Sequence, residues 1–129
     1  MKSLIPLLSI LLFLALGCEK ADFRDEVTGN YTGIRVHSYM MEDSTGNWVT
    51  IWDTTLAEAL ITKAAKESSL DLYLNQGLSS SPYTFEYYRN QRIYIGQHMD
   101  LLLGPDTLYI LFTAGRGPDW VEYFLKKGK

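Results

Sequence analysis

The run Leu70-Asp71-Leu72-Tyr73-Leu74-Asn75 places leucine at every second position, with more polar residues between. Successive side chains of a β-strand point to opposite faces, so this alternation predicts a strand with one apolar face. From Asn30 onward, short apolar runs alternate with clusters of Gly, Asn, Asp, Ser and Pro, at a spacing of roughly 8 to 14 residues. This rhythm predicts an all-β domain, an antiparallel meander of about seven or eight strands that forms a small barrel or a sandwich.

Other parts of the chain fit the same interpretation. Ile34 and Val36 share one face of an early run, as the period of two requires. Two later runs, 83–88 and 92–95, flank Arg89-Asn90-Gln91. This arrangement predicts a tight hairpin between the two runs.

The stretch 56–64 carries two conflicting signals. Thr55-Leu56-Ala57-Glu58 matches a capping box, and the residues that follow are rich in helix formers. Neighbouring β-branched residues and the turn-forming stretch 66–69 favour a strand instead, and tertiary context in a sheet often overrides local propensity. We therefore predict a strand over 56–64, with a helix as the alternative.

The first eighteen residues have the organisation of an export signal. Lys2 precedes a mostly apolar stretch, 4–16, which is too short to span a bilayer as a helix. Leu14-Ala15-Leu16-Gly17-Cys18 resembles the bacterial lipobox, and Cys18 is the only cysteine. The pattern predicts a lipoprotein signal peptide over 1–17 and an acylated Cys18, bearing palmitate or a related chain. The alternative is an ordinary signal peptide that happens to end in a cysteine.

The mature chain would consist of a lipidated tether, 18–29, and a single β domain, 30–129. Cleavage removes one of the 12 basic residues and none of the 15 acidic ones, which leaves 11 against 15 and a formal charge of −4. Nucleic acid is therefore excluded as an expected partner. We expect a protein of the cell envelope, anchored to the outer membrane by its lipid and facing either the periplasm or the exterior. With Cys18 acylated, the domain contains no disulfide.

The chain resembles a group of small Gram-negative lipoproteins of uncharacterised function that have lipocalin-like or related β-meander domains. The resemblance rests on Gly29-Asn30-Tyr31-Thr32-Gly33, on Trp52-Asp53-Thr54-Thr55, on Ser68-Ser69-Leu70 and on the terminal stretch 120–127. Lipocalins begin with Gly-x-Trp, whereas this chain has tyrosine at the third position. The strands are also shorter than a deep ligand-holding calyx requires, so the resemblance implies the fold and not small-molecule carriage.

Catalytic and metal-binding groupings are not recognisable in the sequence. His37 and His98 are far apart in the chain and have no cysteine or histidine neighbours at metal-ligand spacing. Ser79-Ser80-Ser81 lacks the glycines of a nucleophile elbow. We therefore expect a protein that is not an enzyme, with no metal and no cofactor.

Aromatic residues are the remaining signal. Trp48 and Trp52 lie on the same face of one predicted strand, and Tyr83 and Tyr87 share a face of another. These four side chains are candidates for a ligand platform, because flat rings on a sheet stack on sugars or apolar ligands. Aromatic side chains more often fill cores and pair across strands, so we expect the two tryptophans to point into the core.

Three Asp-Ser or Asp-Thr pairs match a pattern used for O-glycosylation in some Gram-negative lineages. They make Ser44, Thr54 and Thr107 candidate glycan attachment sites, although the same pairs are ordinary turn chemistry.

The expected function is that of a lipid-anchored, non-enzymatic module that binds another component of the envelope. Two alternatives remain open. One is a binder of glycans or small apolar ligands through exposed aromatic rings. The other is an inhibitor of an envelope-attacking enzyme such as lysozyme, acting through a protruding loop at 76–82 or 115–119.

Overall fold

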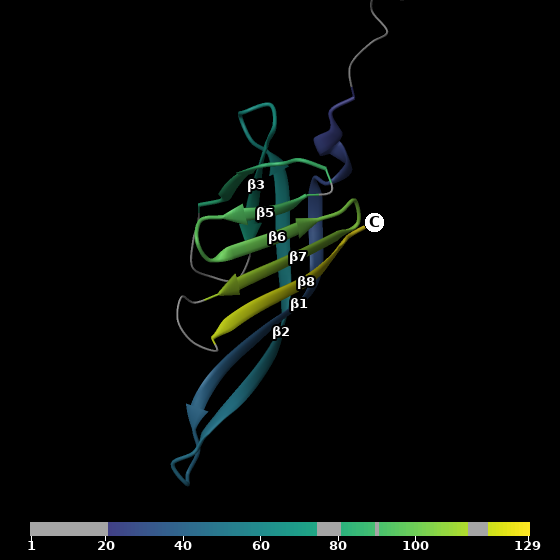
Figure 1. Ribbon diagram of the computed structural model, residues 1–129. Helices are drawn as coiled ribbons and strands as arrows, with labels where there is room; N and C mark the ends of the chain where they lie inside the picture. Colours follow the sequence, from purple (N-terminus) through teal and green to yellow (C-terminus); the bar gives the residue numbers. More distant parts are fainter. Residues whose placement is uncertain (1–20, 75–80, 90, 114–118) are drawn as a thin grey trace, which may run out of the picture.

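Two long strands run side by side through the centre of the protein and carry the rest of the sheet (Figure 1). The computed structural model describes residues 21–74, 81–89, 91–113 and 119–129. In chain order the strands are β1 (Gly29–Glu42), β2 (Trp48–Lys63), β3 (Ser69–Leu74), β4 (Tyr83–Glu86), β5 (Arg92–Ile95), β6 (Met99–Leu103), β7 (Thr107–Thr113) and β8 (Trp120–Lys127). A short 3-10 helix, η1 (Phe23–Glu26), precedes them. The predicted all-β class is confirmed.

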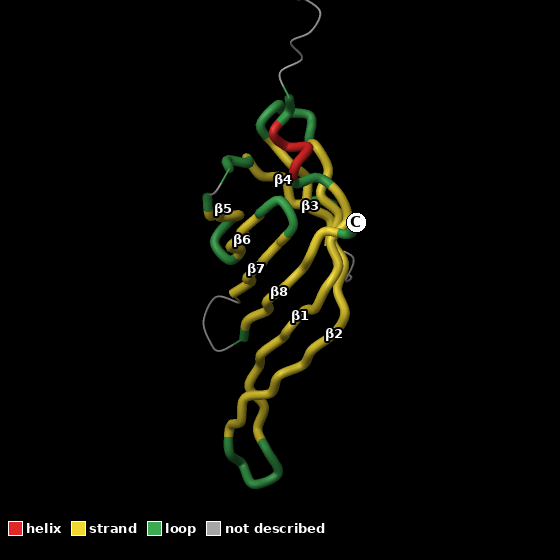
Figure 2. Tube along the Cα trace, turned by 90° about the vertical axis from the view of Figure 1, so that its right-hand side faces the viewer, coloured by secondary structure: helices red, strands yellow, loops and turns green. Residues whose placement is uncertain are grey.

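The strands form one antiparallel sheet in the order β4-β3-β2-β1-β8-β7-β6-β5, curled into a nearly closed barrel (Figure 2). The first and last strands close it, because β1 pairs with β8 from Tyr31↔Lys127 to Ser38↔Trp120. Every other ladder joins neighbours in the chain. The fold is therefore the expected meander, and it takes the barrel form.

The predicted hairpin between 83–88 and 92–95 is wrong. β4 pairs with β3, β5 pairs with β6, and no ladder joins β4 to β5 within the described residues. The backbone N–H of Tyr87 donates to the carbonyl of Ser68, so the chain still follows β3 after β4 ends. Turn chemistry in a sequence indicates a change of chain direction, but it does not determine which strands form hydrogen bonds. The two edge strands leave a seam in the barrel wall.

Buried side chains from all eight strands fill the inner face of the barrel. The core residues are Val27, Tyr31, Ala57, Ala59, Ile61, Leu70, Leu72, Phe85, Tyr87, Ile93, Met99, Leu101, Leu103, Leu108, Ile110, Tyr123 and Leu125. Within this core, the Tyr31 hydroxyl donates to the carbonyl of Val27 over 2.7 Å, and burial raises the pKa of Tyr31 to about 12. A core of this kind gives stability and not the open interior of a carrier protein.

Residues 56–63 of the stretch 56–64 belong to β2, which runs unbroken to Lys63, so the predicted strand is confirmed to within one residue and the helix alternative is wrong. Its period of two explains the outcome. Ala57, Ala59 and Ile61 all point inward and are at most 4% exposed. In a helix Ala59 would point away from Ala57 and Ile61, whereas a strand buries all three on one face.

The expected tether over 18–29 is wrong from Asp22 onward, because that part of the chain is fixed to one end of the barrel. The Arg24 guanidinium is buried and donates to the carbonyls of Lys66 and Ser69 over 3.0 and 3.1 Å. Its Nη2 also donates to the Asp22 carboxylate over 2.7 Å. Val27 is fully buried. The charged residues from Asp22 to Glu26 therefore cover one end of the barrel and do not form an extended linker. Within the described ranges, no helix is both long and apolar enough to cross a bilayer.

Candidate functional site on the projecting hairpin

The far ends of β1 and β2 leave the barrel and continue as a two-stranded ribbon (Figures 1 and 2). Within the described residues, β8 pairs with β1 only as far as Ser38 and β3 pairs with β2 only from Ala59 onward, but β1 and β2 stay paired to Glu42↔Trp48. We call residues 38–53 the projecting hairpin. It points away from the barrel end that carries η1.

A network of hydrogen bonds shapes the tip of the projecting hairpin. The Asp43 carboxylate accepts from the Thr45 hydroxyl over 2.6 Å and from the backbone N–H groups of Thr45 and Asn47 over 2.8 and 3.0 Å. These bonds, with the Thr45 hydroxyl first among them, lower the pKa of Asp43. Gly46 adopts a φ of 84°, which costs a glycine little. The tip is therefore a defined turn.

The expectation that Trp48 and Trp52 point into the core is wrong, since their side chains are 65% and 59% exposed. They do share one face, as their spacing predicts. That face is the outer one, because Ala57, Ala59 and Ile61 occupy the inward positions of the same strand. The small Thr50 between the two rings is compatible with either face, so it was no guide to the direction.

Trp52 meets a partner that lies far away in the sequence. The register places Ser38 of β1 between Trp52 of β2 and Trp120 of β8. The two indole rings meet edge to face above this small residue, with centroids 5.1 Å apart and planes at 83°. Ser38 is 1% exposed, and its hydroxyl oxygen has no hydrogen-bond partner in the described structure. A buried polar group left in this way costs about 1 to 3 kcal/mol.

The inner face of the projecting hairpin is apolar as well. Tyr39 pairs with Ile51 and Met41 pairs with Val49 on this face, and Met41 is 50% exposed. The Tyr39 ring lies 5.0 Å from the His37 imidazole at the base. Contiguous exposed apolar surface is uncommon on monomeric proteins and marks interaction sites. Both faces of this ribbon have that character.

All charge on the projecting hairpin has one sign. Glu42, Asp43 and Asp53 are its only charged residues, and residues 38–53 contain no lysine or arginine. Glu122 of β8 lies two residues after Trp120 and therefore on the same outer face. It accepts a hydrogen bond from the Tyr109 hydroxyl over 2.6 Å. Burial and this bond raise the pKa of Tyr109 to about 12, so its phenol stays a donor and orients Glu122.

The structure does not bring Tyr83 and Tyr87 to the two tryptophans. Tyr87 is buried and stacks on Phe23 with ring centroids 5.7 Å apart. Tyr83 is half-buried, packs against the core and lies 6.1 Å from the Phe112 ring. The predicted four-residue platform therefore divides into two exposed tryptophans and two tyrosines that stabilise the barrel.

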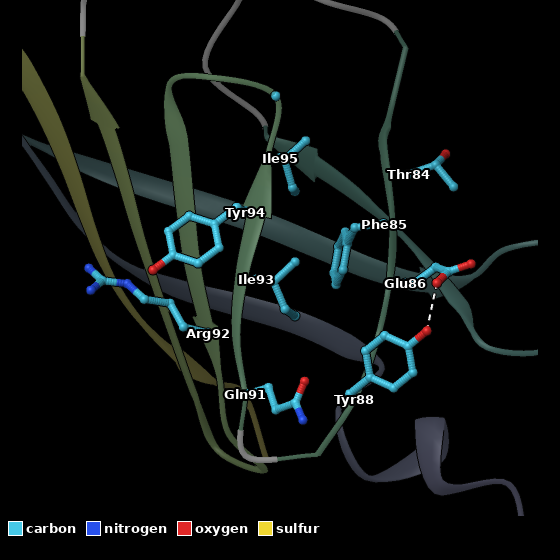
Figure 3. A pocket seen from close by; sticks show the side chains of 10 residues that line it. Thr84, Phe85, Glu86, Tyr88, Gln91, Arg92, Ile93, Tyr94 and Ile95 are labelled. Atoms are coloured by element: carbon cyan, nitrogen blue, oxygen red, sulfur yellow. Dashed lines mark hydrogen bonds between the residues drawn. The ribbon is translucent and has the colours of Figure 1, made fainter.

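A separate cleft of about 510 Å³ follows the seam between β4 and β5 (Figure 3). Phe85 and Ile93 face each other across it, and two exposed tyrosines, Tyr88 and Tyr94, lie along its sides. The sequence offered no pointer to this cleft, because it depends on the missing β4–β5 ladder.

Charged side chains around the seam cleft are held in pairs. Glu86 accepts from the Tyr88 hydroxyl over 2.6 Å and forms an ion pair with Lys66. Arg92 forms an ion pair with Asp100 at 3.1 Å, and its guanidinium lies 5.9 Å from the centre of the Tyr94 ring. The charges of these pairs offset each other, so the lining suits a neutral polar ligand better than an anion.

The two histidines, distant in sequence, line one cleft of about 280 Å³ at the base of the projecting hairpin, together with Asp119 and Trp120. Across the described ranges, no three His, Cys, Asp or Glu side chains are grouped as metal ligands.

Ser44, Thr54 and Thr107 are all exposed, and glycosylation of these residues stays a prediction. Cys18 lies outside the described residues, as do 76–80 and 115–118, which make up most of the two loops predicted for enzyme inhibition.

No protein-family model, curated protein or solved structure matches this chain.

Proposed function

We propose that the protein is a lipid-anchored, non-enzymatic module of the cell envelope that binds another protein through the projecting hairpin. The observation that carries this proposal is the exposure of Trp48 and Trp52 on a ribbon that extends beyond the barrel. Tryptophan, tyrosine and methionine are the side chains enriched at protein interfaces, and buried tryptophan anchors dominate their energetics. The hairpin carries all three types.

The arrangement of the two ends of the molecule supports this proposal. If Cys18 carries the lipid, three residue steps separate it from Ala21, a reach of about 10 Å. Arg24 fixes the chain directly after that point to the barrel end. β2 has 16 residues, which at about 3.3 Å each make it roughly 50 Å long, and the projecting hairpin lies at its opposite end. Such a protein would present the hairpin away from the membrane that anchors it.

Site-specific photo-crosslinking in living cells tests the proposal. A photoreactive residue at Met40, on the outer face of the projecting hairpin, should give one protein adduct of defined mass. The same residue at Tyr94, which is 67% exposed on the barrel, is the matched control and should not give that adduct. Adducts of equal yield at both positions, or none at Met40, would contradict the proposal.

The acyl anchor has its own test. Cys18→Ala protein should leave the membrane fraction, because that cysteine is the only attachment point the sequence offers. Recovery of Cys18→Ala protein in membranes at the wild-type level would remove the anchor from the proposal and leave the binding surface.

A glycan-binding function is the second candidate, and the seam cleft favours it. Exposed tyrosine rings beside paired polar groups provide the stacking surface and hydrogen bonds that a neutral sugar needs, and the cleft volume lies in the range of ligand pockets. Titration with a neutral trisaccharide such as chitotriose, followed by NMR, should then perturb Tyr88 and Tyr94. Tyr94→Ala should abolish the perturbation, whereas Trp48→Ala should leave it intact.

Inhibition of an envelope-attacking enzyme such as lysozyme is a special case of protein binding. Here the projecting hairpin would be the inhibitory element. An inhibition assay with wild-type and Trp48→Ala proteins tests it directly.

A further inference from the structure

We infer that the outer face of the projecting hairpin recognises an arginine or lysine side chain on a basic protein partner, using Trp52, Trp120, Ser38 and Glu122. This inference rests on the proposed function and adds the chemistry of the partner.

The aromatic part of the site is a pair of indole rings from two different strands. Trp52 and Trp120 come from opposite sides of β1 and meet edge to face over Ser38. Trp52 is 59% exposed, so most of its ring is open to a partner. Cations bind over aromatic faces, and tryptophan is the strongest partner of this kind.

Beneath the rings, Ser38 supplies a polar group that has no use in the free protein. Its hydroxyl oxygen is buried without a hydrogen-bond partner among the described residues. A guanidinium has five N–H donors and an ammonium has three, and either could donate to this oxygen once Trp52 turns aside. The orphan hydroxyl and the rings above it therefore suit one and the same ligand group.

Surrounding charge selects a cation. Glu122 lies on the outer face next to Trp120, half-buried and oriented by Tyr109, and Glu42 lies opposite Trp48. Residues 38–53 contain no basic residue. On β8 the nearest outward basic residue, Lys126, is six positions from Trp120, about 20 Å along the strand. The same acidic field disfavours an anionic lipid surface or a nucleic acid as the occupant and steers a basic protein towards the hairpin.

A pair of probes of matched shape tests the inference. The lipidated protein in nonionic detergent is titrated with the peptide acetyl-Gly-Gly-Arg-Gly-Gly-amide and with the same peptide carrying citrulline, the neutral isostere of arginine. NMR follows the indole N–H signals of Trp52 and Trp120. The arginine peptide should shift both signals in a saturable way, and the citrulline peptide should bind about tenfold more weakly. Lysozyme, a basic protein, should shift the same signals, and added salt should weaken its binding.

Variants separate the site from the fold. Trp52→Ala and Ser38→Ala should each weaken binding of the arginine peptide by about fivefold or more while the protein stays folded. Tyr73→Ala removes an exposed aromatic ring of β3, outside both candidate sites, and should leave binding unchanged. Equal binding of the arginine and citrulline peptides, or an equal loss in Tyr73→Ala, would overturn the inference.

The outcomes also distinguish this inference from the proposed function. If the Met40 crosslink forms in cells but the arginine peptide shows no preference, the hairpin binds a protein by other chemistry and the inference fails alone. If the crosslink is absent as well, the proposed function fails with it.

Discussion

β2 passes through two environments, and the same alternation of side chains has opposite consequences in each. Inside the barrel its inward residues, Ala57, Ala59 and Ile61, are buried, and its neighbours β1 and β3 flank it on both sides. In the projecting hairpin its outward residues, Trp48 and Trp52, are exposed, and β1 is its only paired neighbour among the described strands. The largest side chains of the strand thus lie where no layer covers them.

This contrast separates stability from binding within one strand. Small inward residues let the barrel wall close around Tyr31 and the leucines, whereas large outward residues add nothing to that core. Exposed tryptophans are a liability for solubility unless a partner covers them.

The largest effect should come from the barrel core. Leu72 is fully buried on the inner face of β3, so Leu72→Ala should lower the free energy of unfolding by about 2 to 5 kcal/mol. Urea denaturation of the purified protein measures this directly. A loss below about 1 kcal/mol would show that the barrel interior is not the stabilising core.

The two regions also contain glycines that sharpen the comparison. An added Cβ at Gly33 in the barrel wall would collide with the Phe124 carbonyl oxygen and lie 3.0 Å from the Leu125 Cα, so β1 and β8 would have to separate. Gly33→Ala should cost about 2 to 3 kcal/mol. At Gly46 in the hairpin tip an added Cβ has room, and only the positive φ opposes it, so Gly46→Ala should lower the free energy of unfolding by about 1 kcal/mol. Equal losses in the two variants would remove the distinction between wall and ribbon.

The barrel end that carries η1 should respond to pH. Hydrogen bonds from the Arg24 side chain and backbone, and then from Lys63, hold the pKa of Asp22 well below its usual value of 3.8. Because the folded pKa is the lower one, the unfolded chain binds the proton first, so this stabilisation is complete above about pH 5 and is lost progressively as the pH falls towards the folded pKa. Asp22→Asn should therefore lower the melting temperature at pH 7 and matter less at pH 3. Asp119→Asn, which removes an exposed carboxylate near the hairpin, is the control for the loss of one charge and should leave the melting temperature at pH 7 unchanged.

A smaller change is expected at the base of the projecting hairpin. Ser38→Ala removes a buried hydroxyl that has no partner in the described structure, so stability should stay unchanged or rise by up to about 1 kcal/mol. Chemical denaturation of this variant beside the wild type gives the answer. A loss of more than 1 kcal/mol would mean that the hydroxyl has a structural role.

Much of the barrel could be predicted from the sequence, because period-two patterns report local structure. The leucines at 70, 72 and 74 and the stretch 56–64 were recognised as strands for this reason, and the spacing of Trp48 and Trp52 correctly placed them on one face. Which face is covered depends on where neighbouring strands end, and no local pattern contains that information. The direction of the tryptophans was predicted wrongly for this reason.

Long-range pairing explains the other failures. The β4–β5 hairpin was inferred from a turn signal, but the barrel leaves a seam there and closes between β1 and β8 instead. Trp120 and Ser38 join the candidate site only through that closure, so nothing near them in the sequence suggested it. Arg24 looked like part of a charged linker, because its carbonyl partners at Lys66 and Ser69 are distant in the chain.

The central claim is that the projecting hairpin lies outside the stabilising core and is free to bind a partner. The free energy of unfolding of Trp48→Ala tests it most directly, because this residue is large, 65% exposed and far from the barrel. We expect a value within 0.5 kcal/mol of the wild type, the usual range for an exposed position. A loss of about 3 kcal/mol or more, typical of a buried tryptophan, would contradict the account.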